Sequence, residues 1–417
     1  MERLPGFRDF YPEPLPNADA WSADARNHIF RAWRETARRY GFREYDGPPL
    51  ESLELFTLKS GDEIVDQLFN FVDKGERAVA MRPEMTPTLA RMIATSERAY
   101  KKPIKWFALP QLFRYEKQQK GRLREHFQLN CDIFGEADTA ADAELIALLI
   151  DTLRALGLSS DDFVIRLSSR NAWQEFFAKR CADESKAYAF YQVIDKLARE
   201  SAENSHARLA ALGFSLDEVR AFIAAGEPTA ELRSVLDSLT ARGLGAFVQV
   251  DYNVIRGLAY YTGVVFEAFD KKGEFRAIAG GGRYNNLVKL ISGGKVDLPA
   301  LGFGMGDVVL LELIKSRGLL PKFTAGVDVV ALVEDEALRP ETLALVQRLR
   351  EAGFAADFSL VPVKGDKQFK RALELGAAHT VRLERSPEGE VVARLKHLQT
   401  REEKVLAPDT VVAALGR

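Results

Sequence analysis

The sequence predicts an α+β protein with a larger domain over residues 1–320 and a smaller α/β domain over residues 325–417. Within the larger domain, helical and strand-like patterns lie on both sides of residues 170–243, a stretch rich in Ala and charged residues and poor in β-branched ones. That composition predicts a helical insertion between two mixed regions. From about residue 327, strand and helix patterns alternate regularly, which is typical of a parallel or mixed sheet.

The composition is that of a folded protein long enough for two or three domains. The 58 Lys and Arg residues against 60 Asp and Glu give a net charge of −2, which excludes a uniformly basic nucleic-acid binder but allows a local basic surface. The two cysteines and five histidines show no CxxC or HxxxH spacing, which argues against a disulfide framework and a zinc helix. No apolar run is long enough for a membrane span and no secretory signal is seen, so we expect a cytoplasmic protein.

The expected elements follow from periodicity and from residues that start or stop helices. Apolar residues recur at helical spacing over residues 18–40 before Gly41, and Thr86 is expected to cap a helix over residues 86–100. The other expected helices cover residues 139–156, 183–200, 206–212, 216–225, 229–242, 341–352 and 367–375. The expected strands cover residues 67–72, 78–81, 106–115, 127–134, 247–251, 264–269, 275–279, 327–333, 355–360, 380–383 and 391–395.

The segment from Arg114 to Arg124 lies between two expected strands and should form a hairpin loop. It holds five basic residues and one acid, Glu116. A long hairpin with this charge could bind phosphate at its base and nucleic acid at its tip, because Arg pairs well with phosphate oxygens. The alternative is an ordinary solvated charged loop.

Three further segments contain residue types that suit ligand binding. Arg256 lies close to two tyrosines; if buried it needs an anion, and otherwise it is a surface residue at the edge of a Tyr-rich core. Glycines 280–282 would let a ligand approach the backbone closely, although neither they nor the GxGxG of residues 302–306 match a nucleotide-binding fingerprint. Glu84, at the end of an expected strand, could hold an ammonium group or could simply favour the start of a helix.

Taken in order, these segments resemble the histidyl-tRNA synthetases, a family of class II aminoacyl-tRNA synthetases. The resemblance runs from Pro5–Asp9 almost to the C-terminus. Residues 40–51 resemble class II motif 1, residues 113–135 motif 2, residues 256–263 and 280–284 the two histidine-specific motifs, and residues 299–311 occupy the place of motif 3. The C-terminal region resembles the family's anticodon-binding domain.

The resemblance implies a class II antiparallel sheet flanked by helices and a homodimer built through motif 1. It also implies activation of L-histidine by ATP to histidyl-adenylate, with Mg²⁺ bound through the ATP phosphates, and transfer to the 3′ end of tRNA(His). A metal site of the protein's own is left open.

The resemblance also assigns roles to individual residues. Arg114 and Arg256 would be the catalytic residues, and Arg114, Glu116 and Arg122 would bind ATP. The histidine-binding residues would be Glu84, Thr86, Gln128, Asp132, Arg256, Tyr261 and Tyr284. Gln119 and Arg124 would face the tRNA acceptor end.

Some positions depart from the family pattern. Val309 stands where motif 3 usually has an arginine that contacts the ATP tail, a loss for which Arg122 is a candidate to compensate, and Asp132 stands where Glu is usual. Losing one charge-assisted phosphate contact forfeits roughly 1.5–3 kcal/mol. These departures favour an alternative, a catalytically impaired paralogue that senses histidine as a regulatory subunit of ATP phosphoribosyltransferase. A further alternative is an RNA-binding module without enzymatic activity.

Overall fold

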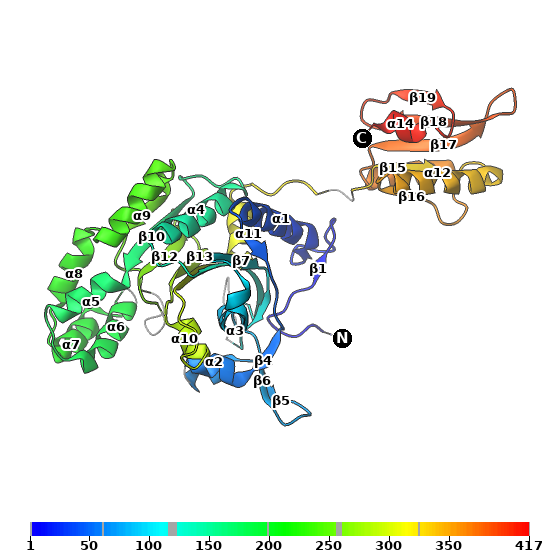
Figure 1. Cartoon of the computed structure of the whole chain (residues 1–417). Coiled ribbons are helices and arrows are strands. Elements are labelled where there is room, and N and C mark those ends of the chain that lie inside the picture. The colour runs from blue at the N-terminus through cyan, green and yellow to red at the C-terminus, as the bar shows by residue number, and fades with distance from the viewer. Residues whose placement is uncertain are drawn as a thin grey trace. The chain divides into compact units, whose positions relative to one another are not determined.

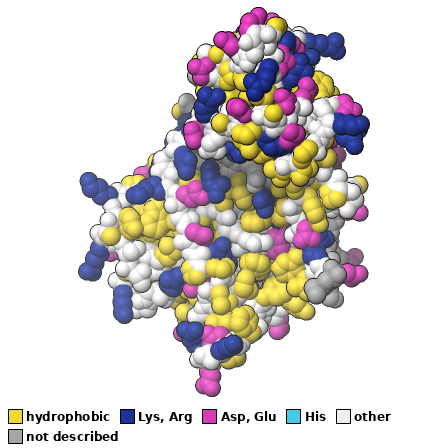
Figure 2. Space-filling view, turned by 90° about the vertical axis from the view of Figure 1, so that its right-hand side faces the viewer, with side chains coloured by type: hydrophobic (Ala, Val, Ile, Leu, Met, Phe, Trp, Pro, Cys, Tyr) yellow, Lys and Arg dark blue, Asp and Glu magenta, His cyan; other side chains and the backbone are white. Residues whose placement is uncertain are grey.

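A computed structural model describes residues 2–60, 62–115, 123–197, 200–255, 261–323 and 326–416. The chain divides into two compact units, one of Met1–Phe10 with Asp19–Leu320 and the other of Tyr11–Ala18 with Pro321–Arg417 (Figure 1). Figure 2 shows basic and acidic side chains interspersed over one face of the protein, in agreement with its formal charge of −2. None of the helices in these residues is long and apolar enough to cross a membrane.

The larger unit is built on a nine-stranded sheet of order β11-β10-β12-β13-β14-β9-β7-β3, with β8 paired to β9. Its strands are β3 (Arg43–Glu44), β7 (Ile104–Ala108), β8 (Gln111–Phe113), β9 (Glu125–Phe134), β10 (Phe163–Ser169), β11 (Val248–Val250), β12 (Val264–Asp270), β13 (Ala279–Arg283) and β14 (Ala300–Gly306). From β10 to β7 every neighbouring pair is antiparallel, and only the edge strands β11 and β3 pair in parallel. The expected antiparallel sheet is therefore confirmed.

Helices and a small second sheet surround these strands (Figure 1). The helices are α1 (Ala23–Arg39), α2 (Leu53–Ser60), α3 (Thr86–Ser96), α4 (Ala140–Arg154), α10 (Leu287–Ile291) and α11 (Asp307–Ser316), with 3-10 turns η1 (Asp62–Gln67), η2 (Glu97–Ala99) and η4 (Gly245–Phe247). The second sheet has the order β4 (Leu50–Ser52), β6 (Ala78–Met81), β5 (Asn70–Val72). Two short strands, β1 (Phe10–Tyr11) and β2 (Trp21–Ser22), precede α1. Helices α1, α4 and α11 gather on one side of the large sheet, where α4 and α11 contact β9.

The insertion predicted from composition contains helices, as expected. They are α5 (Arg170–Ala178), α6 (Ala187–Lys196), α7 (Ala202–Leu212), α8 (Leu216–Ala225) and α9 (Ala230–Ala241), with the 3-10 turn η3 (Glu184–Lys186). Ser or Thr side chains cap the N-termini of α5, α7, α8 and α9, which explains why these helices begin where they do. Stacked and edge-on aromatic rings form the core, including Trp173 and Phe176, each about 5 Å from Phe222.

The smaller unit is a mixed five-stranded sheet of order β16-β15-β17-β18-β19. Its elements are β15 (Val329–Leu332), η5 (Glu336–Leu338), α12 (Arg339–Glu351), β16 (Ala356–Phe358), α13 (Gly365–Glu374), β17 (His379–Arg385), β18 (Val391–His397), β19 (Glu403–Leu406) and α14 (Val411–Leu415). Alternate residues of β15 enter different cores: Val329 and Ala331 pack with α12 and α14, and Val330 and Leu332 pack with α13. Helices thus cover both faces of the sheet, and its mixed pairing is one of the two arrangements that the alternating pattern predicted.

Several expectations for individual elements were wrong. The strand expected at residues 275–279 begins only at Ala279 and runs through glycines 280–282, and the strand β14 over residues 300–306 was missed. Leu109 and Pro110 divide the strand expected at residues 106–115, because Pro cannot donate to a sheet ladder. Thr86 is not a cap: Met85 takes that position, and Thr86 is the first helical residue. β19 and α14 were not predicted.

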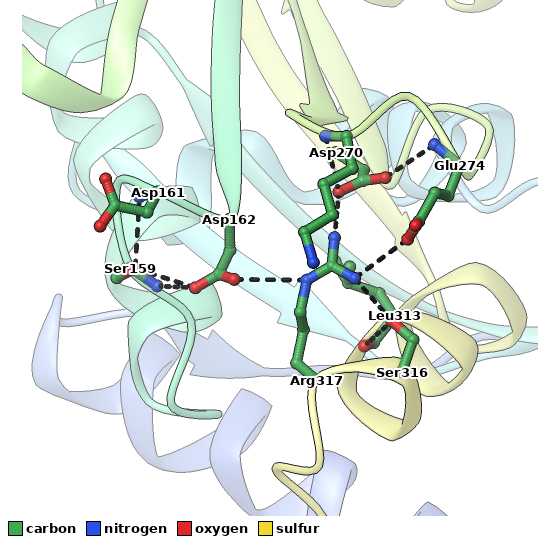
Figure 3. A network of polar contacts seen from close by, with 9 residues as sticks. Ser159, Asp161, Asp162, Asp270, Glu274, Leu313, Ser316 and Arg317 are labelled. Carbon is green, nitrogen blue, oxygen red and sulfur yellow. Dashed lines mark hydrogen bonds and ion pairs between the residues drawn. The ribbon is translucent and has the colours of Figure 1, made fainter.

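A polar cluster ties the end of α11 to the sheet of the larger unit (Figure 3). Arg317 donates to Asp270 at 2.6 Å and to Glu274 at 3.0 Å, and its Nε lies 3.3 Å from Asp162. Asp162 in turn accepts from the backbone and hydroxyl of Ser159, each at 2.9 Å. The Arg317 guanidinium therefore joins the end of α11 to the segment before β10 and to the end of β12 with the loop that follows it.

We expect Arg317→Met to lower the free energy of unfolding by about 2 kcal/mol, because it leaves the buried Asp270 without its charged donor. Urea denaturation of the full chain measures this, with Arg233→Met on the exposed side of α9 as the control. Equal stability of the two variants would show that the cluster contributes nothing.

Candidate functional site

A cavity of about 1320 Å³ opens over the large sheet. Alternate residues of β9, namely His126, Gln128, Asn130 and Asp132, line it, because successive side chains of a strand point to opposite faces. The intervening residues Leu129, Cys131 and Ile133 are buried on the face that α4 and α11 cover. The polar residues of β9 therefore form one wall of a site and the apolar ones anchor it.

Glycines make the floor of this cavity. Gly302 and Gly304 of β14 lie beside Asp132 and Asn130 of β9, and Gly280 of β13 lies beside Gly304. A Cβ atom on Gly302 would lie 1.9 Å from Asp132 Oδ1, and one on Gly304 would lie 2.7 Å from the Gln128 amide carbon. Gly302 and Gly304 thus let the side chains of β9 lie across the next strand.

Asp132 is a buried carboxyl group in the lining of the cavity. Its side chain is 2% exposed, and Oδ1 accepts a hydrogen bond from the Tyr284 hydroxyl. Oδ2 is buried without a hydrogen-bond partner among the described residues. Burial raises the pKa of Asp132 to about 7, against the opposing effects of Tyr284 and the Lys59 charge. A ligand with an N–H group would satisfy this carboxyl group.

A carboxylate and an amine meet elsewhere in the cavity lining. Glu84 precedes α3, and its Oε2 lies 2.5 Å from the Lys59 Nζ of α2. Both residues and Thr86 line the cavity. Glu84 can therefore hold an ammonium group in this position, as it holds that of Lys59. Nothing in the sequence around Lys59 indicated this role.

The structure brings most of the predicted site residues to this cavity. Its lining includes Glu84, Thr86, Arg114, Gln128, Asp132, Tyr261 and Tyr284. Arg114 directly follows β8, and its Nε donates to the carbonyl of Pro83 at 3.1 Å. Arg124 lies at the base of the hairpin with its guanidinium 4.6 Å from the Tyr115 ring, and it is not among the lining residues. Glu116, Gln119, Arg122 and Arg256 lie outside the described residues.

Sequence reasoning missed other lining residues, including Lys59, His126, Asn130, Arg166, Glu267 and Arg276. The alternation of polar residues from His126 to Asp132 could have identified two of them. Within the described ranges, no group of three or more His, Cys, Asp or Glu side chains is placed to hold a metal ion.

Comparison with known proteins shows to which family the chain belongs. Residues 15–307 match the model of the histidyl-tRNA synthetase family, and residues 326–417 match the anticodon-binding-domain model. The chain is 45% identical to the histidine–tRNA ligase of Opitutus terrae, over 99% of this chain and 97% of that protein. The chain belongs to the histidyl-tRNA synthetase family.

More distant members give the same result. The histidine–tRNA ligase of Thermoplasma volcanium is 36% identical over 100% of this chain and 99% of that protein. Among solved structures, the histidyl-tRNA synthetase of Nostoc sp. PCC 7120 has a TM-score of 0.77 at 22% identity and covers 97% of each chain. This last likeness shows the fold and confirms the predicted α+β class.

In this synthetase-family chain, a buried arginine from the N-terminal segment joins two motifs. The Nε of Arg8 donates to Glu125 at 2.6 Å, and another guanidinium nitrogen donates to Asp307 at 2.8 Å. Glu125 also accepts from Gln111 at 3.0 Å, and Asp307 accepts from the backbone N–H of Phe127 at 3.0 Å. The triad of Arg8, Glu125 and Asp307 therefore fastens the base of the motif 2 hairpin to the start of α11.

The charges of the triad need one another, because water does not reach them: the side chains of Arg8 and Glu125 are each 1% exposed. Burial alone would lower the pKa of Arg8, but the charges and hydrogen bonds of Asp307 and Glu125 hold it above its ordinary value. The guanidinium also lies 4.7 Å from the Trp21 ring.

We expect Arg8→Met to lower the free energy of unfolding by about 3–5 kcal/mol, because it leaves two buried carboxylates unpaired. The triple variant Arg8→Met/Glu125→Gln/Asp307→Asn should regain much of that loss, since it buries no charge. Urea denaturation measures both, and Arg3→Met, which removes an exposed ion pair with Asp9, is the control. Wild-type stability of Arg8→Met would contradict the role of the triad.

The raised pKa of Asp132 predicts pH-dependent stability. The unfolded carboxyl group has a pKa of about 3.9, so the ligand-free folded protein binds this proton more tightly and loses stability as the pH rises through about 4 to 7. Between pH 5 and pH 8, the wild type should lose about 2–3 kcal/mol relative to Asp132→Asn. Denaturation at the two pH values tests this, and the exposed Asp161→Asn should behave like the wild type. Parallel profiles for the wild type and Asp132→Asn would refute it.

Proposed function

We propose that this chain is a histidine–tRNA ligase, which activates L-histidine with ATP and transfers it to the 3′ end of tRNA(His). The observation that carries the proposal is a single cavity that joins the buried acceptor Asp132, the carboxylate of Glu84 and the guanidinium of Arg114. These groups match the imidazole and ammonium of histidine and the phosphate of ATP. The matches of both parts of the chain to the family models support the same conclusion.

Histidine would bind with its ring at Asp132. An imidazole N–H supplies the donor that Asp132 Oδ2 lacks, and the Tyr284 hydroxyl keeps the carboxyl group in place. The ammonium group would be held by Glu84 and Gln128, and Thr86 and Tyr261 would complete the wall. Glycines 302 and 304 leave the space that this arrangement needs.

In the first step, a histidine carboxylate oxygen attacks the α-phosphorus of ATP and pyrophosphate leaves, which forms histidyl-adenylate. Nucleophile and phosphates are all anionic, so fixed cations must orient them and stabilise the developing charge. Arg114, together with Arg256, Glu116 and Arg122 of the sequence-based assignment, would position ATP, since Arg offers a planar fork for carboxylate and phosphate. Mg²⁺ would bind the phosphates, and Glu267 is a lining carboxylate with an oxygen suited to it.

In the second step, a hydroxyl of the terminal ribose of tRNA attacks the carbonyl carbon of the adenylate and AMP leaves. Gln119 and Arg124 of the hairpin would face the acceptor end, and the smaller unit would bind the anticodon. The proposal includes a cytoplasmic homodimer. The exposed apolar residues Leu50, Phe71 and Val72 of the three-stranded sheet support a covered surface there.

The second candidate is the histidine-sensing paralogue. Val309 favours it, because that cavity-lining position brings no charge to ATP. The anticodon-binding match over residues 326–417 and the full-length identity to ligases favour the enzyme.

Histidine-dependent exchange of labelled pyrophosphate into ATP tests the proposal. We expect exchange with histidine and none with the other amino acids. Glu84→Gln should raise the KM for histidine about 10- to 100-fold, because it removes a charge-assisted contact, and Glu203→Gln on α7 should leave it unchanged. A wild-type protein that binds histidine without exchange would be a sensor.

A further inference from the structure

We propose that Asn130 binds the imidazole ring of the substrate beside Asp132 and so helps to select histidine. This inference rests on the proposed function, and it adds a specificity residue to which the resemblance assigned no role. It follows from a buried amide oxygen without a partner, from the neighbours of Asn130 in the sheet and from the two nitrogens of an imidazole ring.

The side-chain amide of Asn130 is buried in the lining of the cavity. The residue is 5% exposed and is one of the lining residues. Its Oδ1 is buried without a hydrogen-bond partner among the described residues. A buried acceptor left unpaired costs about 1–3 kcal/mol, so this oxygen is suited to a ligand that brings an N–H donor.

The direct neighbours of Asn130 in the sheet have no polar side chain to pair with this amide. Asn130 lies opposite Gly304 of β14 on one side and opposite Ala108 of β7 on the other. Gly280 of β13, which follows Gly304 in the same row, also has no side chain. A group bound in the cavity is therefore placed to supply the missing donor.

Asn130 lies between Gln128 and Asp132 on the cavity face of β9, where consecutive residues of one face are about 7 Å apart. Gln128 is proposed to bind the ammonium group and Asp132 the ring, so Asn130 lies between the two ends of the substrate. Asp132 is one methylene shorter than the glutamate that is usual in the family, which keeps its carboxyl group closer to the strand. A ring that pairs with Asp132 Oδ2 is therefore held near β9, within reach of the Asn130 amide.

The imidazole ring calls for a second partner of this kind. A neutral imidazole has one N–H donor and one acceptor nitrogen, and an imidazolium has two donors. Asp132 accepts from one ring nitrogen, and the other nitrogen needs a partner of its own. An amide offers both an acceptor and a donor, so Asn130 can pair with that nitrogen in either protonation state. An amino acid without a second ring nitrogen would leave the amide unpaired and would bind more weakly.

Pyrophosphate exchange by the full chain tests this role. We expect Asn130→Ala to raise the KM for histidine about 5- to 100-fold and to leave the KM for ATP unchanged, because only a contact with the amino acid is lost. Asn130→Leu should lose as much, since its side chain is of similar size but has no polar atom. Asn27→Ala, at an exposed asparagine of α1, is the control and should behave like the wild type. Both Asn130 variants should melt no lower than the wild type, since Oδ1 has no partner to lose among the described residues.

Two methylated histidines, each with a methyl group on a different ring nitrogen, test the contact itself. The wild type should bind each of them about tenfold or more weakly than histidine in calorimetry, because both ring nitrogens have a protein partner. Asn130→Ala should discriminate against only one of them. It leaves space for a methyl group beside one nitrogen, whereas Asp132 still pairs with the other.

An unchanged KM for histidine in both Asn130 variants would overturn the inference, as would a wild type that binds both methylated histidines as tightly as histidine. An equal loss of affinity for histidine and both analogues in Asn130→Ala would also overturn it, because the amide would then not contact the ring. If the wild type binds histidine without exchange, the proposed function fails by itself, and the Kd for histidine in the wild type and in Asn130→Ala decides the role of Asn130. A wild type that binds no histidine would overturn both.

Discussion

The guanidinium of Arg8 is the interaction on which the geometry of the site depends. It neutralises Glu125 at the start of β9 and Asp307 at the start of α11, so residues about 120 and 300 positions away along the chain share one buried charge. Asp307 also binds the backbone of Phe127, which fixes β9 against the end of β14. A buried carboxylate without its partner is costly, so arrangements that separate Arg8 from Glu125 or Asp307 are disfavoured.

The glycines of β13 and β14 are explained by how closely neighbouring strands approach them. β13 and β14 consist largely of residues with poor strand propensity, and they stay extended because their neighbours hold them. A Cβ atom at Gly281 would lie 2.2 Å from the Gly302 carbonyl oxygen, and one at Gly282 would lie 2.7 Å from that of Val264. Side chains at these two glycine positions would therefore clash with the neighbouring strands.

The same point explains what the sequence could and could not predict. Helices with clear periodicity and caps, such as α1 and α8, were predictable from local pattern, as was the alternation of the smaller unit. β14 was not, because Gly302–Gly306 is locally a loop sequence and becomes a strand only through its two partners. Family resemblance led to Glu84, Asp132 and Tyr284, whereas Lys59 and Arg276 follow from the tertiary fold alone.

Two carboxyl groups of the cavity lining determine which ligands suit it. Burial raises the pKa of Asp132 to about 7, because a charged carboxylate is costly in this buried position. Glu84, elsewhere in the lining, accepts a hydrogen bond from the ammonium group of Lys59. A ligand that carries both an N–H donor and an ammonium group can satisfy both carboxyl groups, whereas an amino acid with an apolar side chain would leave Asp132 unsatisfied. Selectivity for a hydrogen-bonding ring therefore comes from the cost of leaving a buried acceptor unpaired.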